Sequence, residues 1–232
     1  MSRTCPINGS VVLYADCNEC DMRRRCKMGD IPKAGHISIG IDQSYKRTGI
    51  SICADGELKS VQSVDLSKLD SKSEKRTEIY RKVHKACKMS RAKGITQSVT
   101  IERIRMFSKN FISMDYIESI GALNSIIVDC AFEQGIGVWS VDTRCWKSQV
   151  LGTSKPSENE FGVPPEKWPC VEWLLSKGME DRIKLPVIGR RSKGTFTDAN
   201  GDKWEYDNDA ADSAAIASFW FVGDHSKLKR EN

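Results

Sequence analysis

The segment between residues 98 and 141 alternates a strand, a long helix and a second strand. Residues 98–103 (SVTIER) and 137–141 (GVWSV) are β-prone, and residues 115–134 repeat apolar side chains at helical spacing. Two strands joined by a helix of this length pair in parallel, because antiparallel neighbours are joined by much shorter turns. This segment therefore predicts an α/β fold.

Three antiparallel strands are expected before this segment. The run ISIGID at residues 37–42 places three isoleucines on one face and ends in an aspartate, as a half-buried strand requires. Two further β-prone runs, 48–54 and 58–66, flank Asp55-Gly56, which favours a tight hairpin turn. A basic amphipathic helix over residues 72–93 then returns the chain to the sheet. The expected sheet is mixed, with three antiparallel strands followed by parallel strands, and is flanked by helices.

The C-terminal part is expected to hold an irregular insertion and a final helix. A short helical pattern covers residues 144–151, and the prolines between residues 153 and 206 favour loops, with one hairpin at Asn200-Gly201. A last helix is predicted over residues 208–222. The prediction is one main domain, residues 36–232, with an insertion at about 153–206.

The N-terminal segment, residues 1–30, is expected to form a separate module built on cysteines. A Pro/Gly linker follows it, and its cysteines have the spacing C-x11-C-x2-C-x5-C. A segment this short has too small a core to fold unaided. We therefore expect a structural Zn²⁺ to stabilise it, with an iron-sulfur cluster or unligated thiols as alternatives. The predicted ligands are Cys5, Cys17, Cys20 and Cys26.

The remaining cysteines fall inside predicted elements and are expected to be small buried apolar side chains. His36 is interpreted as a linker residue that could replace a cysteine ligand, and His84 as a surface residue. The cysteines concerned are Cys53, Cys87, Cys130, Cys145 and Cys170.

Composition excludes several classes of protein. The chain has 232 residues, of which 39% are hydrophobic and 29% are charged, and it lacks any apolar run near the roughly 18 residues that cross a bilayer. Its N-terminus lacks the pattern of a secretory signal, so the expected location is the cytoplasm, with no membrane partner. A net charge of +5 permits binding to nucleic acid without requiring it.

Four carboxylates are the candidate catalytic residues: Asp42, Glu102, Asp209 and Asp212. The first two end predicted strands, and the last two are three residues apart, so they share one face of the final helix. If the two strands are neighbours, the acids converge, and such crowding requires cations. Two Mg²⁺ or Mn²⁺ ions about 4 Å apart would then support phosphodiester hydrolysis. The alternative is that each acid is a solvated charge or, for Asp209, a helix cap.

Four short motifs, in order and spacing, resemble those of the RuvC family of Holliday junction resolvases, which have a ribonuclease H-like fold. They are GIDQSYKRTGISI, TIERIRMFSKN, VDTRCWKSQVLGTSK and NDAADSAAIA, and the resemblance spans about residues 37–152 and 207–222. The resemblance implies that the four acids are the metal-binding catalytic residues. It also implies a phosphate-contacting lysine at Lys147 or, as a looser match, Lys155.

The same resemblance implies the substrate and the assembly. It predicts an endonuclease that acts on four-way or other branched DNA, and a homodimer formed through the helix at 115–134, although burial inside one chain would explain that apolar helix equally well. The loop after the second acid offers an aromatic side chain to stack on a base, or to pack in the core. The candidate DNA contacts are Arg105, Phe107, Arg144, Lys147 and Lys155.

Two other functions compete with this hypothesis. The same acids would serve a transposase or a less selective nuclease, and the basic clusters would serve a non-catalytic DNA-binding module. An intact set of four acids disfavours the second, since carboxylates repel phosphates. A compact resolvase with added modules would be nucleoid-associated and is typical of phages and mobile elements. The basic clusters are Arg23-Arg24-Arg25, Arg190-Arg191 with Lys193, and Lys227-Lys229-Arg230.

Overall fold

The computed structural model describes residues 2–4, 11–13, 35–89, 95–103, 114–187 and 194–232. The chain divides into two compact units, residues 1–35 and 36–232. In the first unit, strands β1 (Ser2–Thr4) and β2 (Val11–Leu13) form an antiparallel pair. The four cysteines predicted to bind Zn²⁺ lie outside the described residues.

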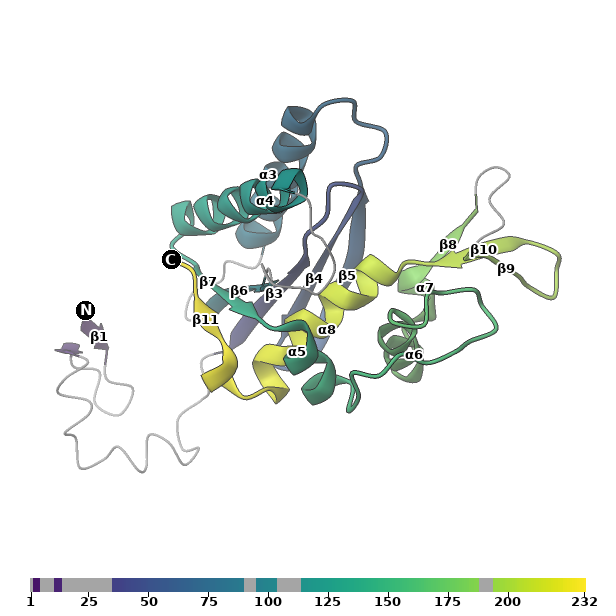
Figure 1. The fold of residues 1–232 in the computed structure, drawn as a ribbon. Helices are drawn as coiled ribbons and strands as arrows, with labels where there is room; N and C mark the ends of the chain where they lie inside the picture. Colours follow the sequence, from purple (N-terminus) through teal and green to yellow (C-terminus); the bar gives the residue numbers. More distant parts are fainter. Residues whose placement is uncertain (1, 5–10, 14–34, 90–94, 104–113, 188–193) are drawn as a thin grey trace. The chain divides into compact units, whose positions relative to one another are not determined.

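The second unit is built on one mixed sheet of six strands (Figure 1). Strand β3 lies between β4, its antiparallel neighbour, and β6, its parallel neighbour, so the predicted combination of antiparallel and parallel pairing is confirmed. The turn at Asp55-Gly56 is also confirmed, since both residues have positive φ angles, 51° and 87°. In spatial order the strands are β11 (Lys229–Arg230), β7 (Gly137–Val141), β6 (Thr96–Glu102), β3 (His36–Asp42), β4 (Arg47–Ala54) and β5 (Glu57–Asp65).

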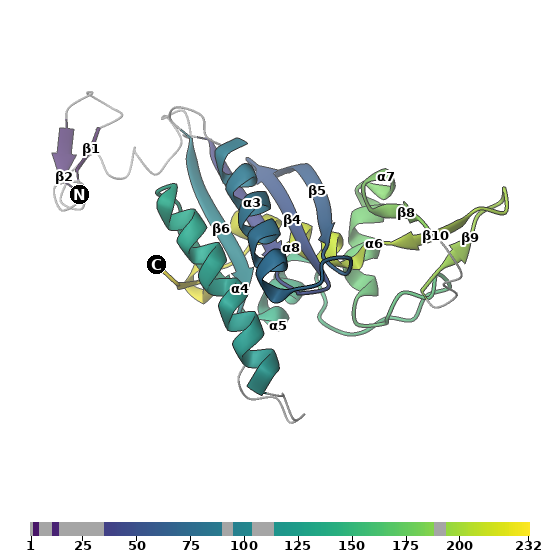
Figure 2. The same ribbon diagram turned by 90° about the horizontal axis from the view of Figure 1, so that it is seen from above.

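Helices cover both faces of this sheet (Figure 2). On one face, α3 (Lys72–Met89) and α4 (Met114–Glu133) pack over a core of aliphatic side chains that includes Ile39, Ile41 and Leu123. On the other face, α5 (Thr143–Val150) and α8 (Asn208–Val222) enclose a second core. Within the described residues, no helix is long and apolar enough to cross a membrane.

Two glycines bring α8 unusually close to the sheet. A Cβ on Gly40 would collide with the backbone of Ser213 and Ala217, and a Cβ on Gly49 would collide with the backbone of Asp209. The facing side of α8 is rich in alanine, so helix and strands approach at backbone distance. This packing fixes the start of α8 directly beside the ends of β3 and β4.

The insertion is more regular than the sequence predicted. It contains α6 (Trp168–Ser176), α7 (Glu180–Ile183) and a sheet with the strand order β8 (Lys184–Pro186), β10 (Lys203–Tyr206), β9 (Phe196–Thr197). The prediction of an irregular segment was wrong because Pro169 stands in the first turn of α6, where proline is compatible with a helix. The predicted hairpin is confirmed, with Gly201 at a φ of 85°.

His36 is the first residue of β3 rather than a linker residue. Its ring bonds the hydroxyls of Thr96 and Ser98, at 2.7 Å and 2.9 Å, and stacks on Trp220. Burial lowers the pKa of His36 to about 4. Of the cysteines predicted to be buried, all but Cys145, which is partly exposed, are buried.

Candidate active site

Asp42 and Glu102 stand side by side at one edge of the sheet. They follow Ile41 and Ile101, which are partners in the parallel register of β3 and β6. Because parallel strands end at the same edge, the two carboxylates reach the same solvent-facing pocket. The condition under which the sequence analysis expected the acids to converge, that these two strands are neighbours, is therefore met.

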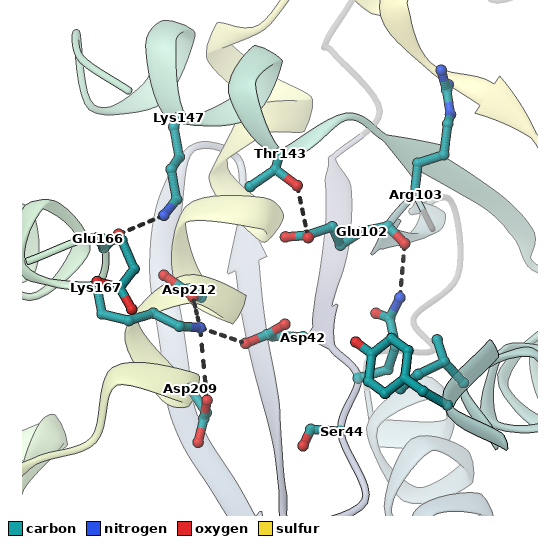
Figure 3. Close-up of a pocket in the computed structure, with 13 residues that line it drawn as sticks. Asp42, Ser44, Glu102, Arg103, Thr143, Lys147, Glu166, Lys167, Asp209 and Asp212 are labelled. Carbon is teal, nitrogen blue, oxygen red and sulfur yellow. Dashed lines mark hydrogen bonds and ion pairs between the residues drawn. The ribbon is translucent and has the colours of Figure 1, made fainter. Parts of the chain in front are cut away.

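Asp209 and Asp212 join them from α8 (Figure 3). The N-cap of this helix is Asp207, whose side chain accepts a hydrogen bond of 3.0 Å from the Ala210 amide. The alternative that Asp209 is the helix cap was therefore wrong. With Asp207 as the cap, Asp209 falls in the first turn and Asp212 one turn later, so both carboxylates line the pocket beside Asp42.

A lysine that the sequence analysis overlooked lies among these acids. The Nζ atom of Lys167 is 3.7 Å from Asp42 Oδ2 and 3.9 Å from Asp209 Oδ1, and it forms a closer ion pair with Asp212. Lys167 is the N-cap residue of α6, which packs on α8. Nothing in the local sequence marks this lysine, because only the packing of α6 brings it to the pocket.

Glu102 is held by different partners. Thr143 Oγ1 donates a hydrogen bond of 2.7 Å to one carboxylate oxygen, and Trp146 Nε1 donates one of 3.3 Å to the other. Both donors come from α5. Gln43 also ties the strand ends together, because its amide nitrogen donates to the Glu102 backbone carbonyl at 2.7 Å. Glu102 is thus oriented by groups of α5 and by the end of β3.

The electrostatics of the pocket reflect its crowding with carboxylates. Burial raises the pKa of Asp42 well above its ordinary value; Lys167 opposes this shift, and the other acids add to it. Burial likewise raises the pKa of Glu102, and that of Asp209 to about 6. For Lys167, burial disfavours the charge, but attraction to Asp212, Asp42 and Asp209 outweighs it and raises the pKa. The acids therefore depend on positive charge among them.

The donor set fits a hard divalent cation by its chemistry. Carboxylate oxygens are the ligands that Mg²⁺ prefers, and Asp212 Oδ1 is buried without a hydrogen-bond partner. In the described part of the chain, however, no three His, Cys, Asp or Glu side chains are arranged to hold an ion. The three aspartates instead surround the ammonium of Lys167, which supplies positive charge among them in this structure.

The residues predicted to contact DNA lie in different positions relative to the pocket. Lys147 lines the pocket, which has a volume of about 550 Å³, and its Nζ donates to the Glu166 carbonyl at 2.7 Å. Arg144 is exposed in the first turn of α5, and Lys155 is exposed outside the pocket lining. Arg105 and Phe107 lie outside the described residues. The pocket adds residues that the sequence analysis did not select, namely Gln43, Ser44, Arg103, Tyr116, Ile120, Thr143, Glu166 and Lys167.

Comparison with known proteins finds similar folds but no similar sequence. No protein-family model matches the chain, and no curated protein matches it. Similar solved structures include Thermus thermophilus RuvC in complex with a Holliday junction substrate (TM-score 0.52) and T. thermophilus RuvC in another structure (TM-score 0.51). Each is 17% identical to this chain, with 84% of this chain and 98% or 99% of RuvC covered. The main domain therefore has the fold of RuvC, a mixed α/β sheet flanked by helices.

Proposed function

We propose that this protein is an endonuclease that hydrolyses phosphodiester bonds of branched DNA, with four-way junctions as its main substrate. The observation that carries the proposal is the gathering of Asp42, Glu102, Asp209 and Asp212 in one pocket, with the Lys167 ammonium among the three aspartates. Solvated surface acids would not lie together in a partly buried pocket, since burial and mutual repulsion both disfavour their charges. The likeness in fold to a RuvC bound to a Holliday junction supports the choice of substrate.

In this proposal the four acids hold two Mg²⁺ or Mn²⁺ ions. When bound, such ions stabilise the charge on the attacking and leaving oxygens of a phosphodiester. Thr143 and Trp146 keep Glu102 oriented, and the capping of α8 by Asp207 keeps Asp209 and Asp212 on the pocket wall. Lys167, whose ammonium lies among the aspartates, would be free to contact a phosphate oxygen of the substrate when cations neutralise these acids.

Cleavage of synthetic DNA tests the proposal. The purified protein is incubated with a four-way junction, a duplex and a single strand of matched sequence, with and without Mg²⁺. The expected result is Mg²⁺-dependent cutting of the junction in preference to the other two. Equal cutting of all three would indicate a less selective nuclease, and binding without cutting in either Mg²⁺ or Mn²⁺ would indicate a non-catalytic module.

We also propose that α4 forms a twofold interface between two copies of the chain. Its inward side chains Ile120 and Leu123 are buried in the monomer, but Met114 and Phe132 are 68% and 70% exposed. Single exposed apolar side chains are common on a monomer surface, so the proposal rests on the breadth of the apolar surface of α4, which is wider than one stripe. A twofold enzyme suits a four-way junction, because symmetric strands are cut in pairs.

Gly121 offers a direct test of the dimer. A Cβ at this position has no neighbour within 4 Å in the monomer, so Gly121→Arg should fold normally and even favour the helix. At a helix-helix interface the same arginine would clash. Light scattering should therefore show a dimer for the unmodified protein and a monomer for the variant. An unmodified protein that stays monomeric at micromolar concentration, even with a junction bound, would contradict the proposed interface.

For the N-terminal unit we propose one structural Zn²⁺ per chain, held by Cys5, Cys17, Cys20 and Cys26. The proposal rests on cysteine spacing alone, since these residues lie outside the described ones. Elemental analysis of the purified protein should give about one zinc per chain. Stoichiometric iron with visible absorption, or freely reactive thiols without metal, would overturn it.

A further inference from the structure

The last residues of the chain are fixed along the edge of the main sheet. Strand β11 pairs with β7, with Lys229 opposite Ser140 and Arg230 opposite Trp139. Beyond the strand, the Glu231 amide donates to the Val138 carbonyl at 2.9 Å, and the Asn232 side chain accepts from the Val138 amide at 2.8 Å. A highly charged terminus normally remains unanchored. Here it is anchored by backbone pairing, while its basic side chains stay at the surface.

Arg103 connects this terminus to the acid pocket. It directly follows Glu102 and lines the pocket, but its side chain points away from the acids (Figure 3). One of its terminal nitrogens donates to the Ser140 carbonyl at 3.1 Å and to the Lys227 carbonyl at 3.2 Å. The short helix η1 (His225–Lys227) is therefore attached to the strand end that carries Glu102.

The pairing in β11 also determines which basic side chain faces which way. Neighbouring residues of a strand point to opposite faces, and Arg230 lies over the Trp139 ring, 5.7 Å from its centre. Lys229 therefore projects to the other face, the face on which its partner Ser140 bonds Arg103 Nε at 3.3 Å. The Lys229 side chain is 66% exposed, and its contact with Glu231, at 3.9 Å, is too long and too exposed to hold it firmly.

We infer that Lys227 and Lys229, here called the tail lysines, bind the phosphate backbone of a duplex DNA arm that leaves the acid pocket. The pocket that would take the scissile phosphate has Arg103 at its wall, and two exposed lysines lie beside that arginine. Lysines on an anchored segment contact phosphates without reading sequence, which suits an enzyme that recognises a branched shape. The inference rests on the proposed function, because it takes the substrate to be DNA.

The test is the salt dependence of DNA binding by the full-length protein. Fluorescence anisotropy with a labelled four-way junction, in Ca²⁺ to prevent cutting, is measured over a range of salt concentrations. The double variant Lys227→Ala/Lys229→Ala should bind more weakly, and the slope of log affinity against log salt should fall by about 2, one unit for each lost phosphate contact. The matched control is Lys85→Ala/Lys88→Ala, which removes the same charge from exposed positions in the last turns of α3.

The outcomes separate this inference from the proposed function. If the tail variant and the α3 control have the same slope and affinity, the assignment of the tail lysines is overturned, whether or not the enzyme cuts junctions. If the unmodified protein binds DNA but does not cut it, the proposed function fails and the slope still decides the binding surface. Absence of DNA binding, or a preference for duplex RNA of the same length, would overturn both proposals.

Discussion

Replacing Asp212 with Asn is expected to abolish Mg²⁺-dependent cutting of a four-way junction while leaving junction binding intact. The substitution keeps the size of the side chain and its place on α8, but it removes a carboxylate whose Oδ1 is buried and unpartnered. Cation binding should weaken accordingly. Cleavage should fall by about 10³-fold or more, the scale of loss when one member of a catalytic unit is removed. Binding should persist or tighten, because phosphates would meet one fewer negative charge.

The equivalent variants Asp209→Asn, Asp42→Asn and Glu102→Gln should behave in the same way. Their losses should not add in double variants, since the four acids act as one unit around the cations. The matched control is Asp181→Asn on α7, an exposed carboxylate outside the pocket, which should cut normally. If all four single variants retained near-normal cutting, the proposed active site would be wrong, and these acids would be structural charges.

Removing the positive charge at Lys167 should have the second large effect, on stability as well as on activity. In Lys167→Met, Asp42, Asp209 and Asp212 lose the ammonium that neutralises them. Breaking this ion-pair cluster should lower the free energy of unfolding at neutral pH by about 1–3 kcal/mol, a range discounted for the partial exposure of the lysine. The melting temperature should fall by about 2–4 °C for each kcal/mol. Cleavage should drop by about 10²-fold or more, because the phosphate loses its ammonium partner.

The dependence of this variant's stability on pH and on Mg²⁺ shows whether its destabilisation comes from the loss of positive charge among the acids. Carboxyl groups whose pKa is raised in the folded protein favour folding when protonated and oppose it when charged. The stability deficit of Lys167→Met should therefore be full at neutral pH and shrink as the pH falls below about 6, the pKa of Asp209 in the unmodified protein. Mg²⁺ should raise the melting temperature of the variant more than that of the unmodified protein, because no ammonium competes for the acids.

Thermal unfolding monitored by circular dichroism, with and without Mg²⁺, measures both effects. Lys85→Met, at an exposed position on α3, removes the same charge away from the pocket and should change stability little. A Lys167→Met protein that unfolds at the same temperature as the unmodified protein at every pH would show that the lysine does not neutralise the acids.

The amino-acid sequence by itself determined the sheet and the position of the acids. Alternation of isoleucines in ISIGID specifies a strand that ends at Asp42, and the strand-helix-strand order over residues 98–141 specifies parallel pairing. Parallel strands end at one edge, so Asp42 and Glu102 had to meet once β3 and β6 were neighbours. The spacing of Asp209 and Asp212 likewise places both on one face of α8 in any helix. These properties follow from local periodicity, which a single sequence records.

Tertiary structure alone decided the rest, because those features depend on contacts between residues far apart in the chain. Lys167 reaches the acids only because α6 packs on α8, and its local sequence looks like that of any exposed lysine before a proline-containing segment. The short strand β11 has no strand-like pattern of its own and is held by the open edge of β7. The apolar surface of α4 is broader than one stripe in sequence, and only packing against α3 and the sheet buries Leu123 while leaving Phe132 exposed. Periodicity defines an element, but the burial of its side chains depends on the elements that pack against it.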